Sequence, residues 1–191
     1  HHDYDPHGNL LRMLHLQPMQ WDYRDQLQMT QRQKINAEDT EGIDRHGERT
    51  WYVYDSSGQR VRKVNELANG AGLKDERIYL GGFEIYRKGG VDPLVRETLH
   101  IKDDKQRIAL VETRNGVDDG TAKQVVRYQF GNHLGSCCLE LDDQARVVSY
   151  EEYTPYGSSA YRAVSKDIKV AAKRYRYTGK ERDEESGLYY H

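Results

Sequence analysis

The chain has 191 residues, of which 36% are hydrophobic and 31% charged, and its formal net charge is -2 at pH 7. Its 29 basic and 31 acidic residues are well mixed, which argues against a nucleic-acid or anionic-membrane partner. The two cysteines are neighbours, Cys137 and Cys138, which excludes a disulfide framework and a cysteine-type zinc site. No apolar stretch approaches the roughly 18 residues of a membrane span.

Tyrosine is the dominant aromatic residue, with 15 copies against 2 phenylalanines and 2 tryptophans. A tyrosine ring packs against apolar surface while its hydroxyl needs water or a hydrogen-bond partner. The apolar fraction is low for a domain that buries one large core. This composition favours sheets whose two faces are both partly wet.

The stretch YDPHGNL at residues 4–10 recurs as YDSSGQR at residues 54–60, and WDYRDQL at residues 21–27 has the features of a variant. In such a unit the aromatic residue ends a strand facing the core, Asp caps the turn, and Gly adopts the positive φ that lets the next strand return. A unit of this kind buries its face only by stacking on neighbours. We assign structural roles to Tyr4, Asp5, Gly8, Tyr54, Asp55 and Gly58.

Short segments rich in β-branched and aromatic residues alternate with Gly, Asn and Asp turn signals, which predicts antiparallel meanders. The predicted strands are residues 50–55, 59–64, 76–80, 83–87, 107–113, 123–130 and 145–153. Residues 36–48 are polar and predict an exposed excursion between paired strands. Residues 157–173 predict a long surface loop, with a helical turn as the alternative.

Three ordered motifs fill the end of the chain: an Asn-His-Leu-Gly-Ser turn at residues 132–136, Glu-Tyr-x-Pro-Tyr-Gly at residues 152–157, and RYRYTGKERDEESGLYYH at residues 174–191. With the Tyr-Asp units, they resemble the YD repeats and the Rhs-associated core of Rhs proteins and of the C component of insecticidal Tc toxins. The core-family positions are Asn132, His133, Leu134, Gly135, Tyr153, Pro155, Tyr156, Gly157, Gly179, Lys180, Glu181, Arg182, Asp183, Gly187, Leu188, Tyr189 and Tyr190.

The resemblance implies an all-β fold with little helix, an antiparallel YD-repeat β-strip that forms part of a hollow spiral shell. Residues 1–127 would be the YD-repeat segment and residues 128–191 the Rhs-associated core segment. The shell would enclose a toxic C-terminal polypeptide until delivery. The implied partners are the remaining shell polypeptide, the enclosed toxin and a translocation component, and the implied location is secreted or extracellular. No cofactor or metal is expected.

The resemblance also implies an aspartate-dependent self-cleavage site, but its residues would lie beyond His191. We therefore assign no catalytic residue and expect no enzymatic activity of this chain. The alternative function is an extracellular tyrosine-rich β-sheet module that binds carbohydrate or a partner protein.

Two groups of residues allow a catalytic or metal-binding interpretation. The charged run at residues 180–185 has the composition of an acid–base site, but mixed-sign runs are more typical of a solvated turn whose charges pair locally. Cys137 and Cys138 with His133 suggest a thiol or metal site. Adjacent residues of a strand point to opposite faces, so we expect the cysteines to pack as small hydrophobic residues.

Overall fold

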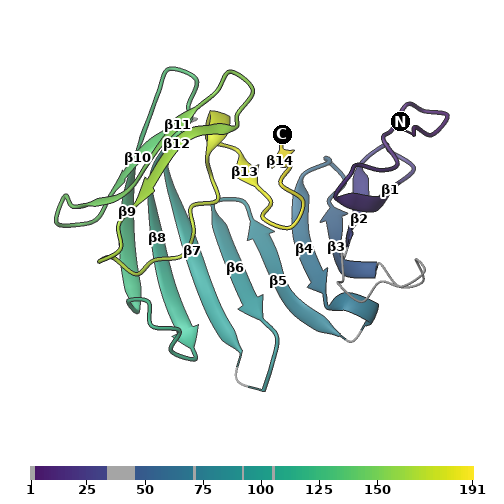
Figure 1. Ribbon diagram of the computed structural model, residues 1–191. Coiled ribbons are helices and arrows are strands. Elements are labelled where there is room, and N and C mark those ends of the chain that lie inside the picture. Colours follow the sequence, from purple (N-terminus) through teal and green to yellow (C-terminus); the bar gives the residue numbers. More distant parts are fainter. Residues whose placement is uncertain (1–2, 34–45, 71, 92, 105) are drawn as a thin grey trace. The chain divides into compact units, whose positions relative to one another are not determined.

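The computed structural model describes residues 3–33, 46–70, 72–91, 93–104 and 106–191, and its regular elements are almost all strands (Figure 1). The two exceptions in this part of the chain are short 3-10 turns, η1 (Ala68–Gly70) and η2 (Tyr177–Gly179). The predicted fold class, antiparallel all-β with little helix, is confirmed. No helix among these residues is long and apolar enough to cross a membrane.

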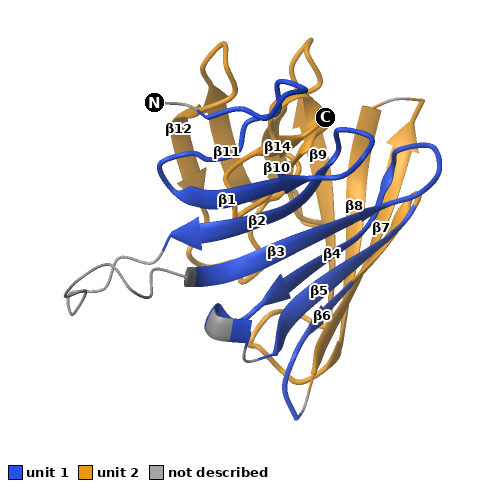
Figure 2. Ribbon diagram, turned by 90° about the vertical axis from the view of Figure 1, so that its right-hand side faces the viewer, with its two compact units in different colours: residues 1–80, 86–91 blue, residues 81–85, 92–191 orange. Residues whose placement is uncertain are grey.

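The chain divides into two compact units, coloured separately in Figure 2. Unit 1 contains residues 1–80 and 86–91, and unit 2 contains residues 81–85 and 92–191. The predicted boundary between residues 127 and 128 lies inside a strand of unit 2. That boundary rests on sequence motifs and stays a prediction about family segments.

Unit 1 is an antiparallel meander in which each strand pairs with the next along the chain. Its strands are β1 (Leu16–Trp21), β2 (Leu27–Gln33), β3 (His46–Tyr54), β4 (Arg60–Glu66) and β5 (Leu73–Leu80). The strand β6 (Phe83–Lys88) has residues in both units.

Unit 2 continues in the same style and adds a small two-stranded sheet formed by β13 (Glu181–Arg182) and β14 (Tyr189–Tyr190). Its main strands pair in chain order. They are β7 (Leu94–Asp103), β8 (Gln106–Gly116), β9 (Gln124–Gly131), β10 (Cys137–Leu141), β11 (Val147–Tyr153) and β12 (Ser159–Val164).

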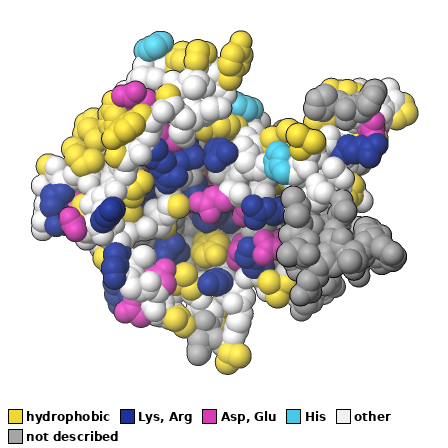
Figure 3. All heavy atoms as spheres, viewed as in Figure 1, with side chains coloured by type: hydrophobic (Ala, Val, Ile, Leu, Met, Phe, Trp, Pro, Cys, Tyr) yellow, Lys and Arg dark blue, Asp and Glu magenta, His cyan; other side chains and the backbone are white. Residues whose placement is uncertain are grey.

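Polar side chains fill much of the interior of both units. The buried hydrophobic residues of unit 1 are Leu16, Met19, Met29 and Tyr52, and those of unit 2 are Ala109, Leu110, Cys137 and Val148. Buried polar and charged residues outnumber them, and Arg127, Glu84, Glu140 and Glu151 are almost fully enclosed. Basic, acidic and apolar side chains are also interspersed on the face shown in Figure 3. Hydrogen-bonded and ion-paired side chains therefore occupy interior positions that apolar side chains fill in most globular domains.

All seven predicted strand segments coincide with observed strands, and the turn unit at residues 21–27 and the strand expected at Cys137 and Cys138 agree with β1, β2 and β10. The strands β7, β12 and β13 were not predicted. The interpretation of residues 157–173 as a loop is wrong for β12, whose six residues are all exposed and show no apolar alternation. No helix forms in that stretch. Most of the predicted excursion at residues 36–48 lies outside the described residues.

Candidate functional site

Three turns of unit 1 are closed by an aspartate in the same way. The Oδ1 atom of the aspartate accepts the backbone N–H groups of the second and fourth residues after it, at 2.8 to 3.0 Å. The aspartates are Asp5, Asp22 and Asp55. The third residue after each has a positive φ, of 91° at Gly8, 59° at Asp25 and 84° at Gly58. The WDYRDQL stretch thus forms the same turn with Asp in place of Gly.

Hydrogen bonds stabilise the charged form of two of these carboxylates. The amide of Asn9 lowers the pKa of Asp5, and the hydroxyl of Ser57 lowers the pKa of Asp55. Tyr54 donates its hydroxyl proton to the Leu27 carbonyl at 2.8 Å. Tyr4 forms a single bridge with Leu10 and is 59% exposed, so the expectation that it faces the core is wrong.

Side chains link each of these turns to the next. Asn9 Nδ2 donates to Asp25 Oδ1 at 2.7 Å, and Gln26 Nε2 donates to the Gly58 carbonyl at 3.3 Å. Arg24 Nη1 donates to the Ser56 carbonyl at 2.9 Å. The YD turns therefore form a hydrogen-bonded ladder within unit 1, which is a structural role.

In unit 2, residues 171–190 lie along one face of the sheet, and we call this segment the C-terminal block (Figure 1). Arg127 Nη1 donates to the Ala171 carbonyl at 2.9 Å, and Lys173 Nζ donates to the Cys137 carbonyl at 2.7 Å. Further along, the Thr178 N–H donates to Ser136 Oγ at 3.0 Å. The candidate functional site of unit 2 is this docked face.

The first group of contacts, the Glu84 cluster, contains Glu84, His100, Arg107, Arg174 and Tyr175. Glu84 is held by Arg174 Nη2 at 2.6 Å and by the Tyr175 hydroxyl, which donates to it. His100 Nδ1 accepts a hydrogen bond from Arg107 Nε at 2.8 Å. The Arg107 guanidinium lies 3.7 Å from the centroid of the Tyr175 ring, a cation–π contact. Burial raises the pKa of Tyr175 well above its ordinary value, so its hydroxyl keeps its proton.

The second group, the Glu151 cluster, anchors the block to β11. Lys173 Nζ lies 2.9 Å from Glu151 Oε2, and Arg176 Nη2 lies 3.0 Å from Glu151 Oε1. Ser159 Oγ and the Tyr153 hydroxyl also donate to Glu151. The Ser159 hydroxyl and the Lys173 ammonium outweigh burial and lower the pKa of Glu151.

The third group, the Glu140 cluster, lies between β8, β9, β10 and β11. Arg127 bridges Glu140 at 2.6 Å and Glu112 at 3.3 Å. Glu140 also accepts hydrogen bonds from Gln129 Nε2 at 2.9 Å and Ser149 Oγ at 2.6 Å. The Arg127 charge outweighs burial and lowers the pKa of Glu140. Glu140 is therefore held ionised by several partners, as in structural ion pairs.

The structure brings the separate core-family motifs together at the end of the block. The Asn132 side chain accepts the N–H groups of Leu134 and Ser136, at 3.0 and 3.1 Å, which shapes the turn that presents Ser136 to the block. Tyr177 donates its hydroxyl proton to the Pro155 carbonyl at 2.6 Å, and Tyr189 donates to the Gly157 carbonyl at 3.0 Å.

Gly157 lies against the ring of Tyr177. It has a φ of 84°, and a Cβ atom at this position would lie 2.8 Å from Tyr177 Cδ1. Both the backbone conformation and the close approach therefore require glycine.

The charged run is only in part the solvated turn that the sequence predicted. Glu181 and Asp183 are buried, with 3% and 4% exposure, whereas Lys180 and Glu184 are exposed. Glu181 Oε1 lies 2.6 Å from Arg174 Nη1, so its partner comes from the preceding extended part of the block. The backbone of Asp183 bonds with Gly187 and Leu188, which closes the turn between β13 and β14.

The remaining core-family residues have diverse surroundings. His133, Leu134 and Tyr156 are exposed, and Tyr156 is 94% exposed. Gly135 has a φ of 76°, and the Gly179 carbonyl accepts a hydrogen bond from Arg107. Arg182 pairs with Tyr189 and Glu181 with Tyr190 in the small sheet.

Cys137 is buried and Cys138 half-buried, and both are free thiols. Burial raises the pKa of Cys137 to about 12, which keeps it protonated and poorly nucleophilic at neutral pH.

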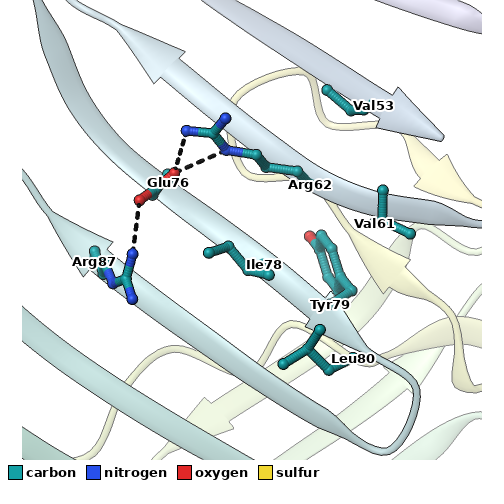
Figure 4. Close-up of a pocket in the computed structure, with 8 residues that line it drawn as sticks. All are labelled: Val53, Val61, Arg62, Glu76, Ile78, Tyr79, Leu80 and Arg87. Carbon is teal, nitrogen blue, oxygen red and sulfur yellow. Dashed lines mark hydrogen bonds and ion pairs between the residues drawn. The ribbon is translucent and has the colours of Figure 1, made fainter. Parts of the chain in front are cut away.

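Unit 1 contains one further concave feature, an open pocket of about 520 Å³ (Figure 4). Its apolar lining comes from Val53, Val61, Ile78, Tyr79 and Leu80. Glu76 lies between two arginines, at 2.6 Å from Arg62 and 3.4 Å from Arg87. Tyr79 is the only aromatic ring in this lining, so the pocket is not a platform of stacked rings of the kind that binds sugars.

Sequence reasoning did not identify Glu84, His100, Arg107, Arg127, Glu140, Glu151 or Arg174. Glu84 and Arg174 are 90 residues apart, and neither lies in a motif that marks it as a partner of the other.

Comparison with known proteins supports the same assignment as the motifs. No protein-family model matches the chain. Toxin subunit YenC1 of Yersinia entomophaga is 30% identical over 192 residues, which cover 98% of this chain and 19% of that protein. Toxin subunit YenC2 of the same organism is 34% identical over 146 residues, which cover 73% of this chain and 15% of that protein. The chain thus spans less than a fifth of these relatives.

Solved structures of Tc toxin complexes contain the same fold. A crystal structure of TcdB2-TccC3-Cdc42 matches 98% of this chain and 9% of its own with a TM-score of 0.78 and 26% identity. The Photorhabdus luminescens Tc holotoxin pore matches 98% of this chain and 8% of its own, with a TM-score of 0.77 and 26% identity. The meander and its docked block therefore define a shell-type β-sheet segment of the Tc toxin class. More narrowly, the chain is an Rhs-type protein that resembles the Tc toxin C component.

Proposed function

We propose that this chain is a stretch of the wall that encloses a toxic polypeptide lying C-terminal to it in a secreted Tc-type toxin. Its partners would be the remaining shell polypeptide, the enclosed polypeptide and a companion toxin subunit. The observation that carries the proposal is the match over 98% of the chain to Tc toxin complexes. The buried ion pairs add support, because a wall with wet surfaces on both sides has little apolar material to bury.

The edge of unit 2 fits this role. Among the described residues β12 pairs only with β11, and all six of its side chains are exposed. An unpaired edge presents backbone N–H and C=O groups that another strand can complete. Further strands of the shell polypeptide are the natural partner for this edge.

We also propose that the chain itself performs no catalysis. Support comes from Glu140 and Glu151, whose pKa values are lowered by bound cations and hydroxyl groups. A carboxylate held in its charged form by several donors is unsuited to donate a proton near neutral pH. Glu151→Gln in the intact protein is expected to leave any self-cleavage at its original rate once the variant has folded. Loss of cleavage in a folded variant would contradict this proposal.

The test of the wall uses the full natural polypeptide that contains this chain. The polypeptide C-terminal to residue 191 is expected to resist an added protease while the wall is intact. Ser149 is buried on β11 and pairs with both β10 and β12. Ser149→Pro interrupts the pairing of these strands, so it should expose the enclosed polypeptide to digestion.

Asp143→Pro is the matched control. Asp143 follows the turn-closing Asp142 as Pro6 follows Asp5, so proline suits this position and protection should persist. Digestion of the downstream polypeptide in the unmodified protein, at the rate of the same polypeptide alone, would overturn the proposal.

A further inference from the structure

His100 is a buried histidine whose protonation state the structure defines. Its side chain is 3% exposed, and its Nδ1 atom accepts a hydrogen bond from Arg107 Nε at 2.8 Å. The arginine nitrogen always carries its proton, so Nδ1 must supply the lone pair. The ring is therefore neutral, with its proton on Nε2. That atom lies 2.9 Å from Glu84 Oε1, a close contact that is poorly aligned for a hydrogen bond.

The contacts of the neutral ring leave no acceptor for a second proton on His100. It would bind Nδ1, and the Nδ1–H and Arg107 Nε–H groups would then face each other as two donors. Glu181 pairs with Arg174 of the Glu84 cluster. With Glu181 included, the cluster contains two carboxylates, on Glu84 and Glu181, and two guanidiniums, on Arg107 and Arg174. An imidazolium would add one unbalanced positive charge in a buried region, where repulsion between like charges is strong.

Arg107 transmits this conflict to the C-terminal block. Its guanidinium covers the Tyr175 ring, and its Nη1 atom donates to the Gly179 carbonyl at 3.2 Å. The His100 and Tyr175 rings also pack edge to face, with 4.9 Å between the centroids. Any movement of Arg107 away from Nδ1 therefore disturbs both of its contacts with the block.

We propose that His100 makes the docking of the C-terminal block dependent on pH: protonation at Nδ1 displaces Arg107 and loosens the block from the face of the sheet. The groups that face His100 are Glu84 of β6, Arg107 of β8, and Arg174 and Tyr175 of the block, with Glu181 paired behind Arg174. The proposal concerns contacts within unit 2 and does not depend on the enclosure of a downstream polypeptide.

The direction and the pH window follow from linkage. Burial lowers the pKa of His100, and the adjacent Glu84 only partly opposes this effect. In the released state the histidine regains an ordinary pKa of about 6.5, so release takes up a proton below that pH. Docking is thus at full strength above about pH 6.5 and weakens as the pH falls toward the pKa of the docked state. Glu140 and Glu151, with lowered pKa values, stay ionised across this window.

Amide hydrogen–deuterium exchange of residues 173–182, measured in the full natural polypeptide and corrected for the intrinsic rate, tests the proposal. Protection should fall as the pH is lowered from about 7.5 to 5.5, by up to about tenfold per pH unit. In His100→Gln the amide oxygen can accept from Arg107 and the amide nitrogen can face Glu84. This variant should keep the block docked and lose the pH dependence.

His133→Gln is the matched control, because His133 is exposed in the turn that contacts the block, and its loss should leave the pH dependence intact. Exchange that is independent of pH in the unmodified protein, or equal pH dependence in His100→Gln, would overturn the proposal.

A second measurement needs no variant. Exchange of the imidazole C2 hydrogen reports the pKa of each histidine separately. We expect a pKa for His100 below the ordinary histidine value of about 6.5, and a value at or above it would contradict the proposal even if His100→Gln does not fold.

Discussion

Arg127 shows how a single buried charge is stabilised in this protein. It is 2% exposed and meets Glu112, Glu140 and a backbone carbonyl of the C-terminal block. Two carboxylates offset the cost of burying one guanidinium, and together they raise the pKa of Arg127 above its ordinary value. Replacing a whole buried ion pair with apolar residues is often harmless, but removing one member leaves an uncompensated charge.

Arg127→Met is accordingly expected to lower the free energy of unfolding by about 3 to 5 kcal/mol, because Glu140 and Glu112 lose their cation. Arg127→Lys keeps the charge and loses only the forked geometry, so its cost should be smaller. Denaturant unfolding of the two variants measures the difference. Equal losses would show that packing, rather than charge, is what Arg127 supplies.

Asn132 shows how a neutral side chain stabilises a turn, since its Oδ1 atom accepts two backbone N–H groups. Asn132→Ala should lower the free energy of unfolding by about 1 to 2 kcal/mol, as the loss of a similar helix cap does. Asn132→Asp keeps the acceptor and should be nearly neutral. Thermal unfolding of both variants tests this, and a destabilised Asp variant would argue that the side-chain nitrogen of Asn132 matters.

At the scale of elements, the sequence predicted strands wherever apolar or aromatic residues alternate. The periodicity analysis left out strands whose buried residues are largely polar, such as β2, which buries Thr30 and Gln31 along with Met29. It also missed β12, whose residues are all exposed. Hydrophobic periodicity reports only apolar burial, so it cannot detect a sheet that buries hydrogen-bonded side chains.

The residues of the candidate site also fall into a group that the sequence predicted and a group that it did not. Local motifs were enough to single out Asn132, Gly157 and Gly187, because turns need particular residues at fixed spacing. The partners of Glu84 and Glu151 could not be found, since those contacts join residues distant in the chain with no local signature. The burial of Glu181 was missed for the same reason, because its environment depends on the docking of the block.

Substitution of Gly157 tests the docking of the C-terminal block on the sheet. Gly157→Ala should destabilise the block in two ways, through a strained positive φ and through contact with Tyr177. Gly120 has a φ of 81° and nothing within 4 Å of an added Cβ, so Gly120→Ala carries the backbone cost alone. We expect Gly157→Ala to cost about 1 to 3 kcal/mol more than Gly120→Ala. Faster hydrogen exchange of residues 173–190 in the first variant only would assign the difference to the block, and equal exchange would show that Tyr177 yields freely.

For the whole molecule, we expect the exposed side chains of β12 to make the free chain prone to self-association. Tyr161 is 56% and Val164 48% exposed on a strand that, within the described residues, has a neighbour on one side only. Natural edge strands avoid pairing with each other by carrying lysine or proline. β12 carries neither, although Arg162 provides one charge. A strand built in this way suits a position where more of the polypeptide pairs with it.

Tyr161→Lys should therefore raise the monomer fraction of the chain of residues 1–191, as measured by sedimentation velocity. The lysine places a charge on the edge strand and removes an exposed ring. Tyr156→Lys makes the same chemical change at a turn residue that is 94% exposed and lies outside β12, so it should leave association unchanged. If both variants raise the monomer fraction equally, net charge rather than edge pairing governs association. If neither does, the contact lies elsewhere on the sheet, and the assignment of β12 as the strand where the wall continues loses its support.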